Sequence, residues 1–368
     1  MLFMSLAQCF IIMHQTVTNH DAIGNDIEYM YNILSKYAEC YVYAENCLNK
    51  KVQYITEENF EKKVSEKQTV VIYHHSVLWK HGQDLLEHVK GKIIFKYHNI
   101  TPAHFFEEYN EIHFTLCDQG RRQTKELEER FPDALWISDS EYNAEDLGEV
   151  SKERQEICAP FHKTDEWIQT KPDEGILNKL IQSNTINIMF VGRVVPNKGH
   201  AFLLDIVAKY NYVYDKKIKL YIIGKFDEGL PKYNAEIREK ISEYGIQEYV
   251  EFVGEINDSI LASYYLGCDF YVCASEHEGF CVPIIEAQRL GLPIIALGDC
   301  AVPETIGKNQ IILDKDLDKF ISAIQVIFTT EEYKDYLINQ GLENYNKRFS
   351  YEKIEERFTY VLKKAGVI

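Results

Sequence analysis

The sequence lacks several features that would place it in a common class of protein. Its 368 residues include nine cysteines but no C-x-x-C pair, and its formal net charge is −17. Scattered thiols in odd number are typical of a reduced, cytosolic protein rather than a disulfide framework. The negative charge repels phosphate, which excludes a general nucleic-acid binder. We see no internal repeat and no low-complexity tract.

Long hydrophobic runs are also missing. No segment approaches the about 18 apolar residues of a transmembrane helix. The apolar start "MLFMSLAQCFIIM" has no basic n-region, is interrupted by Gln8 and precedes no clear cleavage site, so it does not read as a signal peptide. We expect residues 9–13 to form the first buried strand.

Short apolar runs alternate with helical patterns along the chain. They lack polar alternation, which favours parallel strands covered on both faces. Helical patterns lie between them, for example over 199–210 and 234–244. Repeated strand–helix–strand units predict a doubly wound α/β fold. The expected strands are 9–14, 69–74, 92–98, 134–140, 186–192, 219–224, 249–254, 269–275 and 292–297.

The alternation breaks once, over the largely polar residues 161–185. We therefore predict two Rossmann-like domains, residues 1–165 and 166–345, facing a central cleft. Ligands bind at the carboxyl ends of the strands in such folds. Residues 346–368 are expected to form a helix that packs back across the domains. Its apolar stripe is Tyr351, Ile354, Phe358, Val361 and Leu362.

The stretch "EHEGFCVPIIEAQRLGLPIIA", residues 276–296, places two acids around a turn. We expect a strand to end at Ser275, Pro283 to take the first helical position and Glu286 to lie in the first helical turn. Amides at such a helix start can hold phosphate, and a carboxylate can accept from two neighbouring sugar hydroxyls. The alternative is structural: Glu286 favours the helix start, and Glu278 is a solvated loop acid.

Two further strand ends carry similar signals. In "MFVGRVVPNKGH", residues 189–200, Arg193 and Lys198 follow a strand that ends at Gly192. Such a pair can clamp a diphosphate, although two exposed cations would give the same pattern. In "YIIGKFDEG", Gly224 would allow close approach of the backbone to a base or phosphate, or would serve a structural turn.

These pieces together resemble family 4 retaining glycosyltransferases of the GT-B fold, of the bacterial surface-polysaccharide type. The C-terminal half is similar through "VGRVVPNKGH", "FVGEIND", "YYLGCDFYVCAS" and "HEGFCVPIIEAQRLGLPIIA", the last being like the family's E-x7-E signature. The N-terminal half is similar through "HDAIGNDI", "YHHS", "KYHNITPAHFF" and "SDSEYNAEDL". The resemblance covers nearly the whole chain except residues 161–185, and it does not specify a sugar.

The resemblance implies roles for individual residues. Arg193 and Lys198 would hold the donor's diphosphate and stabilise the leaving group, and Glu286 would bind the ribose hydroxyls. Glu278 and His98 would contact the donor sugar, although His98 can also be read as a satisfied histidine at a strand end. The loop "DAIGN" has one glycine where many members have two. The implied donor site includes Gly24, Gly192, Gly224, Gly279, Phe280, Cys281, Val282 and Glu286. Asn25, His74 and His75 are candidates on the acceptor side.

The implied reaction moves a hexose-type sugar from a UDP- or GDP-sugar to a glycan or lipid-linked acceptor, in surface polysaccharide or lipopolysaccharide synthesis. Retention would follow from attack on the face that the leaving group departs from. No cofactor or metal is expected, because "DKD" at Asp314–Asp316 is better explained by helix capping.

Alternatives are another GT-B enzyme, namely a nucleotide-sugar epimerase or a sugar phosphorylase, or a silent sugar-nucleotide-binding subunit. We expect a cytoplasmic protein. Residues 346–368 hold six Lys/Arg against three Glu, which predicts a weak contact with anionic lipid on the inner face of the cell membrane.

Overall fold

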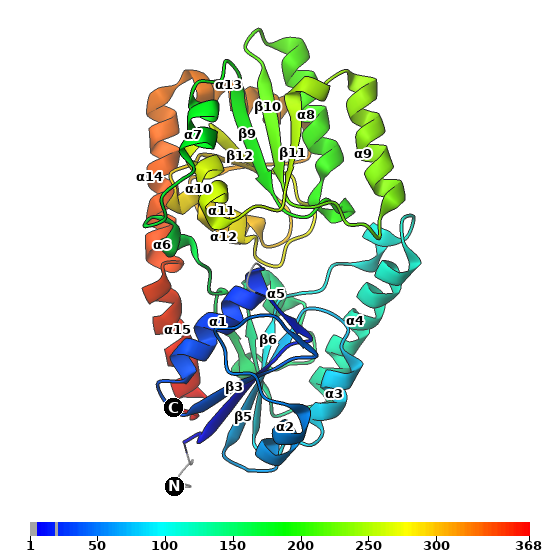
Figure 1. Cartoon of the computed structure of the whole chain (residues 1–368), viewed down its shortest axis with the longest axis vertical. Helices are drawn as coiled ribbons and strands as arrows, with labels where there is room; N and C mark the ends of the chain where they lie inside the picture. Colours follow the sequence, from blue (N-terminus) through cyan, green and yellow to red (C-terminus); the bar gives the residue numbers. More distant parts are fainter. Residues whose placement is uncertain (1–5, 19–20) are drawn as a thin grey trace. The chain divides into compact units, whose positions relative to one another are not determined.

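The computed structural model describes residues 6–18 and 21–368. It divides into two compact units (Figure 1). The first unit holds the described part of residues 1–103 together with Thr115–Lys163 and Ser350–Ile368; the second holds His104–Phe114 and Thr164–Phe349. The polar segment 161–185 contains no strand, only the short helices α6 (Thr164–Trp167) and α7 (Glu174–Ile181). His20 of the quoted "HDAIGNDI" and the first five residues lie outside the described residues.

The first unit is built on a parallel sheet of six strands in the order β3-β1-β5-β6-β7-β8. These strands are β1 Cys9–Met13, β3 Glu39–Tyr43, β5 Thr69–His75, β6 Lys92–Tyr97, β7 Leu135–Ser138 and β8 Gln155–Ile157. A small pair, β2 Thr16–Val17 and β4 Asn46–Cys47, lies beside it. All seven residues of β5 are buried, as expected for a strand covered on both faces.

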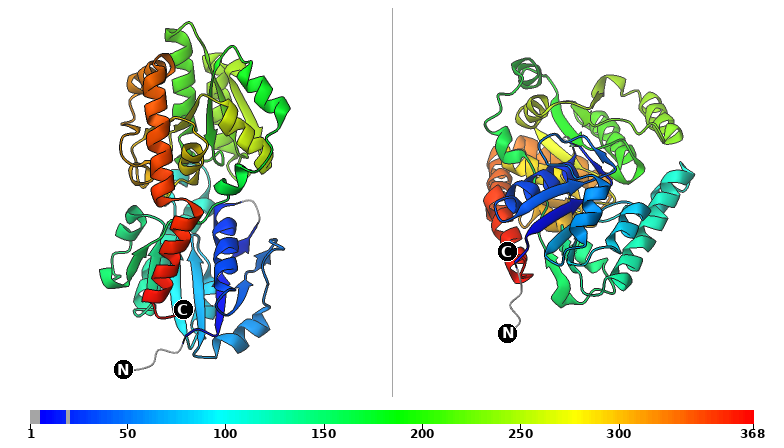
Figure 2. Two further views of the ribbon diagram at one scale, coloured as in Figure 1. Left: turned by 90° about the vertical axis from the view of Figure 1, so that its left-hand side faces the viewer. Right: turned by 60° about the horizontal axis from the view of Figure 1, so that its bottom comes forward.

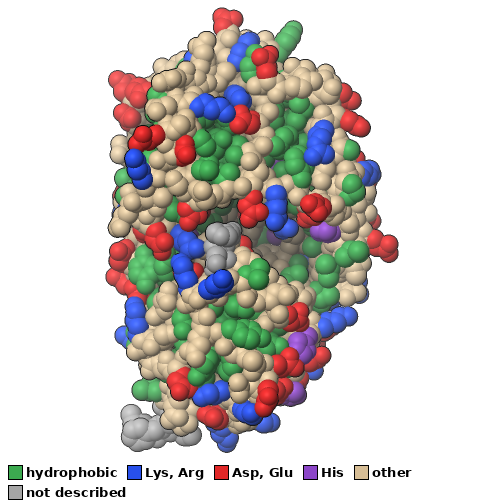
Figure 3. Space-filling model, viewed as in Figure 1, with side chains coloured by type: hydrophobic (Ala, Val, Ile, Leu, Met, Phe, Trp, Pro, Cys, Tyr) green, Lys and Arg blue, Asp and Glu red, His purple; other side chains and the backbone are tan. Residues whose placement is uncertain are grey.

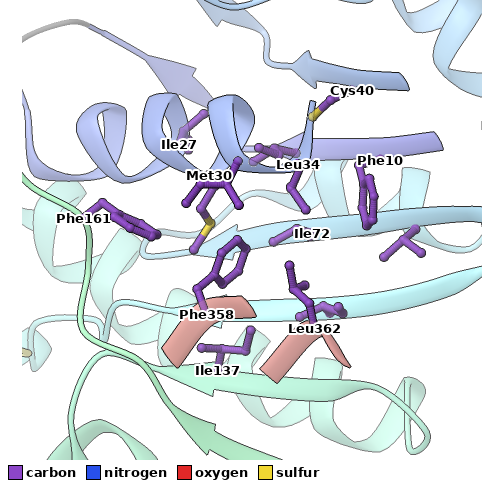
Figure 4. Packing of buried hydrophobic residues seen from close by; sticks show 14 of the residues in the cluster. Phe10, Ile27, Met30, Leu34, Cys40, Ile72, Ile137, Phe161, Phe358 and Leu362 are labelled. Atoms are coloured by element: carbon purple, nitrogen blue, oxygen red, sulfur yellow. The ribbon is translucent and has the colours of Figure 1, made fainter. Parts of the chain in front are cut away.

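Helices of this unit cover both faces of the sheet. On one face α1 (Ala22–Leu34) and α15 (Tyr351–Lys364) pack their apolar residues on Ile72 and Ile137 (Figure 4). On the other face α2 (Glu57–Val64), α3 (Lys80–Leu86) and α4 (Glu111–Arg130) pack against Tyr73, Phe95 and Trp136. The unit also contains α5 Glu141–Glu145 and the 3-10 turn η2 Lys152–Arg154, and η1 Ala103–Phe106 leads out of it.

The second unit repeats this plan with a parallel sheet in the order β11-β10-β9-β12-β13-β14. Its strands are β9 Ile186–Val191, β10 Ile218–Ile223, β11 Val250–Gly254, β12 Phe270–Cys273, β13 Ile294–Leu297 and β14 Ile311–Leu313. Besides α6 and α7, its helices are α8 His200–Val213, α9 Pro231–Tyr244, α10 Asp258–Gly267, α11 Val282–Arg289, α12 Val302–Ile306, α13 Leu317–Thr329 and α14 Glu331–Arg348. The 3-10 turns η3 Pro196–Lys198 and η4 Gln247–Tyr249 complete it.

The predicted α/β fold is confirmed, because every expected strand is present in a parallel sheet. The expected helices over 199–210 and 234–244 also exist, with somewhat different ends: α8 continues to Val213, and α9 begins at Pro231. The strand expected to end at Ser275 stops at Cys273. The strands that were not predicted include β3 and β8, which form the two edges of the first sheet, and the short pair β2 and β4.

The C-terminal helix predicted from the apolar stripe is confirmed as α15. Ile354, Phe358 and Leu362 are buried in the core of the first unit, and the helix lies along that unit's sheet (Figure 2). Several of its basic side chains are paired: Arg357 and Lys364 both bond Glu156 of β8, and Lys353 pairs with Glu356. On the visible face in Figure 3 acidic and basic side chains are interspersed.

Candidate functional site

Three strand ends of the second unit approach one another closely through glycine. The Gly192 N–H donates to Ile223 O over 2.9 Å, and Gly224 has φ +142°. A Cβ at Gly224 would lie 2.1 Å from Gly192 O, and one at Gly199 would lie 2.0 Å from Ala274 O. Because no side chain fits at either place, the ends of β9, β10 and β12 form a compact backbone edge. Anion sites in doubly wound folds lie at such edges.

Lys198 and Glu278 meet at this edge. The Lys198 Nζ lies 2.6 Å from Glu278 Oε1, and both side chains are largely buried, being 22% and 13% exposed. Lys198 is the last residue of η3, and Gly199 caps α8 in a left-handed conformation with φ +68°. Burial by itself would lower the pKa of Lys198, but the Glu278 carboxylate outweighs burial and raises it. Lys198 is therefore a charged donor held beside the strand ends.

Arg193 lies at the same edge and is far more exposed, at 66% of its side chain. Its Nη1 lies 3.5 Å from Oδ2 of Asp227, whose other oxygen accepts from the Gly229 N–H. His113 Nε2 lies 3.3 Å from the same Asp227 oxygen. The Arg193 guanidinium is thus oriented by a carboxylate that a second group also contacts, and its exposure leaves it open to an anion.

His113 belongs to the segment 104–114, which precedes most of α4 in the chain but packs on the second unit. Asn110 Nδ2 donates to Gly229 O over 2.6 Å, and Tyr109 OH donates to Glu236 over 3.0 Å. The Tyr109 ring also meets the Tyr233 ring edge to face, with centroids 5.3 Å apart. Nothing in the local pattern of "FFEEYNEIHF" signals this docking.

Glu286 is placed differently from the sequence prediction. Helix α11 begins at Val282, so Pro283 is its second residue and Glu286 its fifth, beyond the first turn. The correction has a local cause: Cys281 caps the helix with φ +72°, which starts the helix one residue early. Glu286 is buried and accepts from Tyr265 OH over 2.6 Å. Burial raises its pKa to about 7.

The remaining donor-side residues surround this helix start. Phe280 and Cys281 are buried, and the Phe280 carbonyl accepts from Thr305 Oγ1 over 2.6 Å. Val282 and Gly279 are partly exposed. Cys281 Sγ lies 3.9 Å from Cys273 Sγ at the end of β12. The described cysteines are free thiols.

His98 lies in the first unit, within a buried polar group. Its Nδ1 is 2.7 Å from Asp139 Oδ2, and its Nε2 is 2.8 Å from His74 Nδ1. Lys96, buried two positions earlier in β6, donates to the other Asp139 oxygen. Asp26 of α1 is also buried and adjoins the histidine pair. Sequence reasoning missed Asp26, Lys96 and Asp139, although a lysine inside the apolar run "KIIFKYH" was an available signal.

The other candidates of the first unit have different surroundings. His75 points to the opposite face from His74, where its Nε2 lies 2.9 Å from Thr124 Oγ1 of α4, and burial lowers its pKa to about 3. Its burial leaves no surface for an acceptor. The sequence predicted a loop at Gly24 and Asn25. The structure instead places both residues in the first turn of α1, because Asp21 caps that helix through the Gly24 N–H. A Cβ at Gly24 would lie 2.0 Å from Thr18 O.

Two clusters that contain aspartate are candidates for metal binding. Asp316 caps α13 by accepting from the Asp318 and Lys319 N–H groups, and Asp314 pairs with Lys319, so capping explains "DKD". Among the described residues, Asp26, His74 and His98 have ligand atoms within 4.8 Å of one another and could hold a metal ion. The two nitrogens of His74 and His98 are, however, at a hydrogen-bonding distance.

Comparison with known proteins finds a family match within the second unit. Residues 176–344 match the model of the glycosyl transferases group 1. The chain is 25% identical over 225 residues to MMP alpha-(1->4)-mannosyltransferase of Mycolicibacterium hassiacum, covering 58% of this chain and 53% of that protein. It is 22% identical over 235 residues to alpha-1,3/1,6-mannosyltransferase ALG2 of Dictyostelium discoideum, covering 58% and 56%. The chain thus spans about half the length of these curated relatives.

Solved structures resemble the whole chain. The Anabaena protein HepE in complex with UDP-glucose gives a TM-score of 0.76 at 15% identity, covering 96% of this chain and 99% of that one. WaaG, a glycosyltransferase involved in lipopolysaccharide biosynthesis, gives 0.70 at 12% identity, covering 94% and 98%. This likeness shows the GT-B fold. Across residues 6–18 and 21–368, the helices are all too short or too polar to cross a membrane.

Proposed function

Residues 176–344 belong to the group 1 glycosyl transferases, and from this premise we propose that the chain is a retaining hexosyltransferase. It moves a hexose from a nucleoside-diphosphate sugar to a glycan or lipid-linked acceptor. The observation that carries this proposal is the Lys198–Glu278 pair, 2.6 Å apart at an edge where three strand ends leave room only for backbone. A cation and an acid side by side suit a ligand that presents phosphate and hydroxyls together.

Each part of the donor has a matching group in the second unit. The diphosphate takes Lys198 and the exposed Arg193, which stabilise the negative charge of the departing nucleoside diphosphate. Glu278 accepts from hydroxyls of the sugar, and Glu286 binds the ribose. Removing one preorganised donor of this kind generally costs about 10²–10³ in rate. The contact of His98 with the donor sugar, implied by the family resemblance, stays a prediction.

We further propose attack on the same face as departure, which retains the anomeric configuration. Both acids of the second-unit site already have partners within the protein. Glu278 forms an ion pair with Lys198, and Glu286 is buried and accepts a hydrogen bond from Tyr265. Neither suits a covalent nucleophile. Positive charge from Lys198 and Arg193 makes a metal unnecessary for leaving-group departure, and Asp314 and Asp316 are occupied in capping α13.

The names of relatives support a hexose donor and a surface glycan product. Two are mannosyltransferases, a third is an O-antigen chain mannosyltransferase of Escherichia coli, and the HepE structure contains UDP-glucose. We propose a UDP- or GDP-hexose donor, an acceptor in polysaccharide or lipopolysaccharide assembly, and a cytoplasmic location with weak contact to anionic membrane.

A donor screen tests the proposal. The protein is incubated with UDP- and GDP-hexoses and a panel of glycan and lipid-linked acceptors, and free nucleoside diphosphate and product mass are measured, with and without excess EDTA. We expect release of the diphosphate together with an acceptor heavier by one hexose, unchanged by EDTA. Interconversion of donors without transfer would indicate an epimerase, and activity lost in EDTA and restored by manganese would overturn the metal-free mechanism.

A further inference from the structure

The first unit places a lysine where burial is costly. Lys96 lies in the central strand β6, its side chain is fully buried, and the same strand face carries Ile94 in the apolar core. Its ammonium group donates to Asp139 Oδ1 and to Cys158 O. Replacing such an ion pair with apolar residues is often neutral or stabilising, so a buried pair is weak evidence for stability. The charge on Lys96 therefore calls for another explanation.

Asp139 distributes its two oxygens between two partners. Oδ1 accepts from Lys96, and Oδ2 lies 2.7 Å from His98 Nδ1. Burial alone would raise the pKa of Asp139, but the charges of His98 and Lys96 outweigh it and hold that pKa below its usual value. An ionised carboxylate only accepts hydrogen bonds, so the proton between the two residues belongs to His98 Nδ1.

The other nitrogen of His98, Nε2, is then the one whose protonation state can change. His98 Nε2 lies 2.8 Å from His74 Nδ1, and the two rings are stacked with centroids 5.0 Å apart. Neutral His98 accepts a hydrogen bond from His74 Nδ1–H there, whereas charged His98 donates one to His74. Asp26 Oδ2 lies 3.9 Å from His98 Nε2 and 3.8 Å from His74 Nδ1, is buried, and has no hydrogen-bond partner. It is a second carboxylate, besides Asp139, that can offset a charge on His98.

We propose that Asp139, held in its ionised form by buried Lys96, is a positioning residue that fixes His98 as the Nδ1–H form. The Nε2 atom is thereby left able to exchange a proton with His74 and to form a hydrogen bond with a hydroxyl of the substrate. This inference rests on the proposed function, because it gives His98 a task in sugar transfer. It adds that the task depends on residues from β6 and β7 that never touch the substrate. A carboxylate that orients a metal-ligating histidine commonly contributes 10- to 100-fold in activity, and we expect an effect of about that size here.

The test uses the histidine ring itself. Ring nitrogen and proton NMR of the full chain, assigned by His98→Gln, reports which nitrogen of His98 carries the proton. In the parent protein we expect protonated Nδ1. In Asp139→Asn we expect a mixture of tautomers and a turnover number lowered about 10- to 100-fold, with little change in the KM for donor. Glu156→Gln is the matched control, since it removes another buried carboxylate with two donors, Arg357 and Lys364.

Asp139→Asn leaves Lys96 buried without its ionised partner, so the double variant Lys96→Met with Asp139→Asn is measured as well. A parent spectrum with the proton on Nε2, or variants that fold and keep the His98 signals unchanged, would overturn the inference. Stoichiometric zinc bound to the purified protein and lost in His74→Ala would replace it with a metal site. If no donor is turned over, the proposed function fails while the NMR result still decides the tautomer.

Discussion

Lys198 Nζ lies 2.6 Å from Glu278 Oε1, so two residues expected to hold different parts of a sugar nucleotide hold each other in this structure. The pair explains how a largely buried lysine keeps its charge, since Glu278 raises its pKa against the effect of burial. It also means that a diphosphate competes with a carboxylate for the same ammonium group.

This competition predicts opposite effects of two substitutions on the binding of UDP or GDP alone. Lys198→Met removes the cation and should weaken binding about 10- to 100-fold, the usual effect of losing a charge-assisted hydrogen bond. Glu278→Gln removes the competing negative charge and should leave binding equal or tighter, while lowering affinity for the complete sugar nucleotide. Calorimetric titration measures both. If the two substitutions weaken the binding of UDP or GDP equally, Lys198 and Glu278 do not have these opposite roles.

Gly199 and Gly245 form a matched pair for testing the compact edge. Both have left-handed backbones, with φ +68° and +63°, but a Cβ at Gly199 would lie 2.0 Å from Ala274 O, whereas one at Gly245 meets nothing within 4 Å. Gly245→Ala should cost about 1 kcal/mol in backbone strain. Gly199→Ala should cost roughly 2 kcal/mol more, because the strand end must move. Urea unfolding compares the two variants. Equal losses in the free energy of unfolding would show that the backbone edge has room for a Cβ at Gly199.

Glu286 should make stability depend on pH. Burial raises its pKa from 4.5 to about 7. As pH rises through this window, the unfolded chain releases the proton before the folded one does, so the free energy of unfolding falls, by up to roughly 3 kcal/mol. Glu286→Gln should flatten this slope. Tyr265→Phe, which removes the hydrogen bond to the carboxylate, should extend the slope to higher pH. Unfolding curves from pH 4.5 to 8 test this, and a parent-like slope in Glu286→Gln would contradict it.

Ion pairing sharpens the prediction for membrane contact. Lys364 already pairs with Glu156, while Lys363 has no ion-pair partner among the residues that the structure describes. Sedimentation with anionic vesicles at low salt should therefore fall more in Lys363→Gln than in Lys364→Gln. The difference should be small, since one charge near the surface contributes about 1 kcal/mol. If the parent protein does not sediment with the vesicles, the membrane contact is ruled out.

Sequence patterns identified most of the fold because buried parallel strands are continuous apolar runs. The strands β3 ("ECYVY") and β8 ("QEI") were missed because edge strands carry polar residues and can be short. At the site, Lys198 and Glu278 were found because each follows a strand within a short motif. The position of Glu286 in α11 was wrong by one residue, because the left-handed Cys281 starts the helix early.

Long-range contacts explain what sequence reasoning could not find. Asp26, His74, His98 and Asp139 come from α1, β5, the end of β6 and the end of β7, and only the parallel sheet brings them together. The docking of residues 104–114 on the second unit has the same character: Asn110 bonds Gly229, more than a hundred residues away. Local periodicity carries no information about either contact.

The most direct test of the central claim is donor turnover in variants of the proposed diphosphate clamp. Free nucleoside diphosphate is measured with the best UDP- or GDP-hexose and acceptor, for the parent protein, Arg193→Ala and Lys198→Ala, after circular dichroism shows that each is folded. We predict transfer by the parent and a loss of about 10²–10³ in rate for each variant. Transfer at the parental rate by either folded variant would show that Arg193 and Lys198 do not clamp the diphosphate.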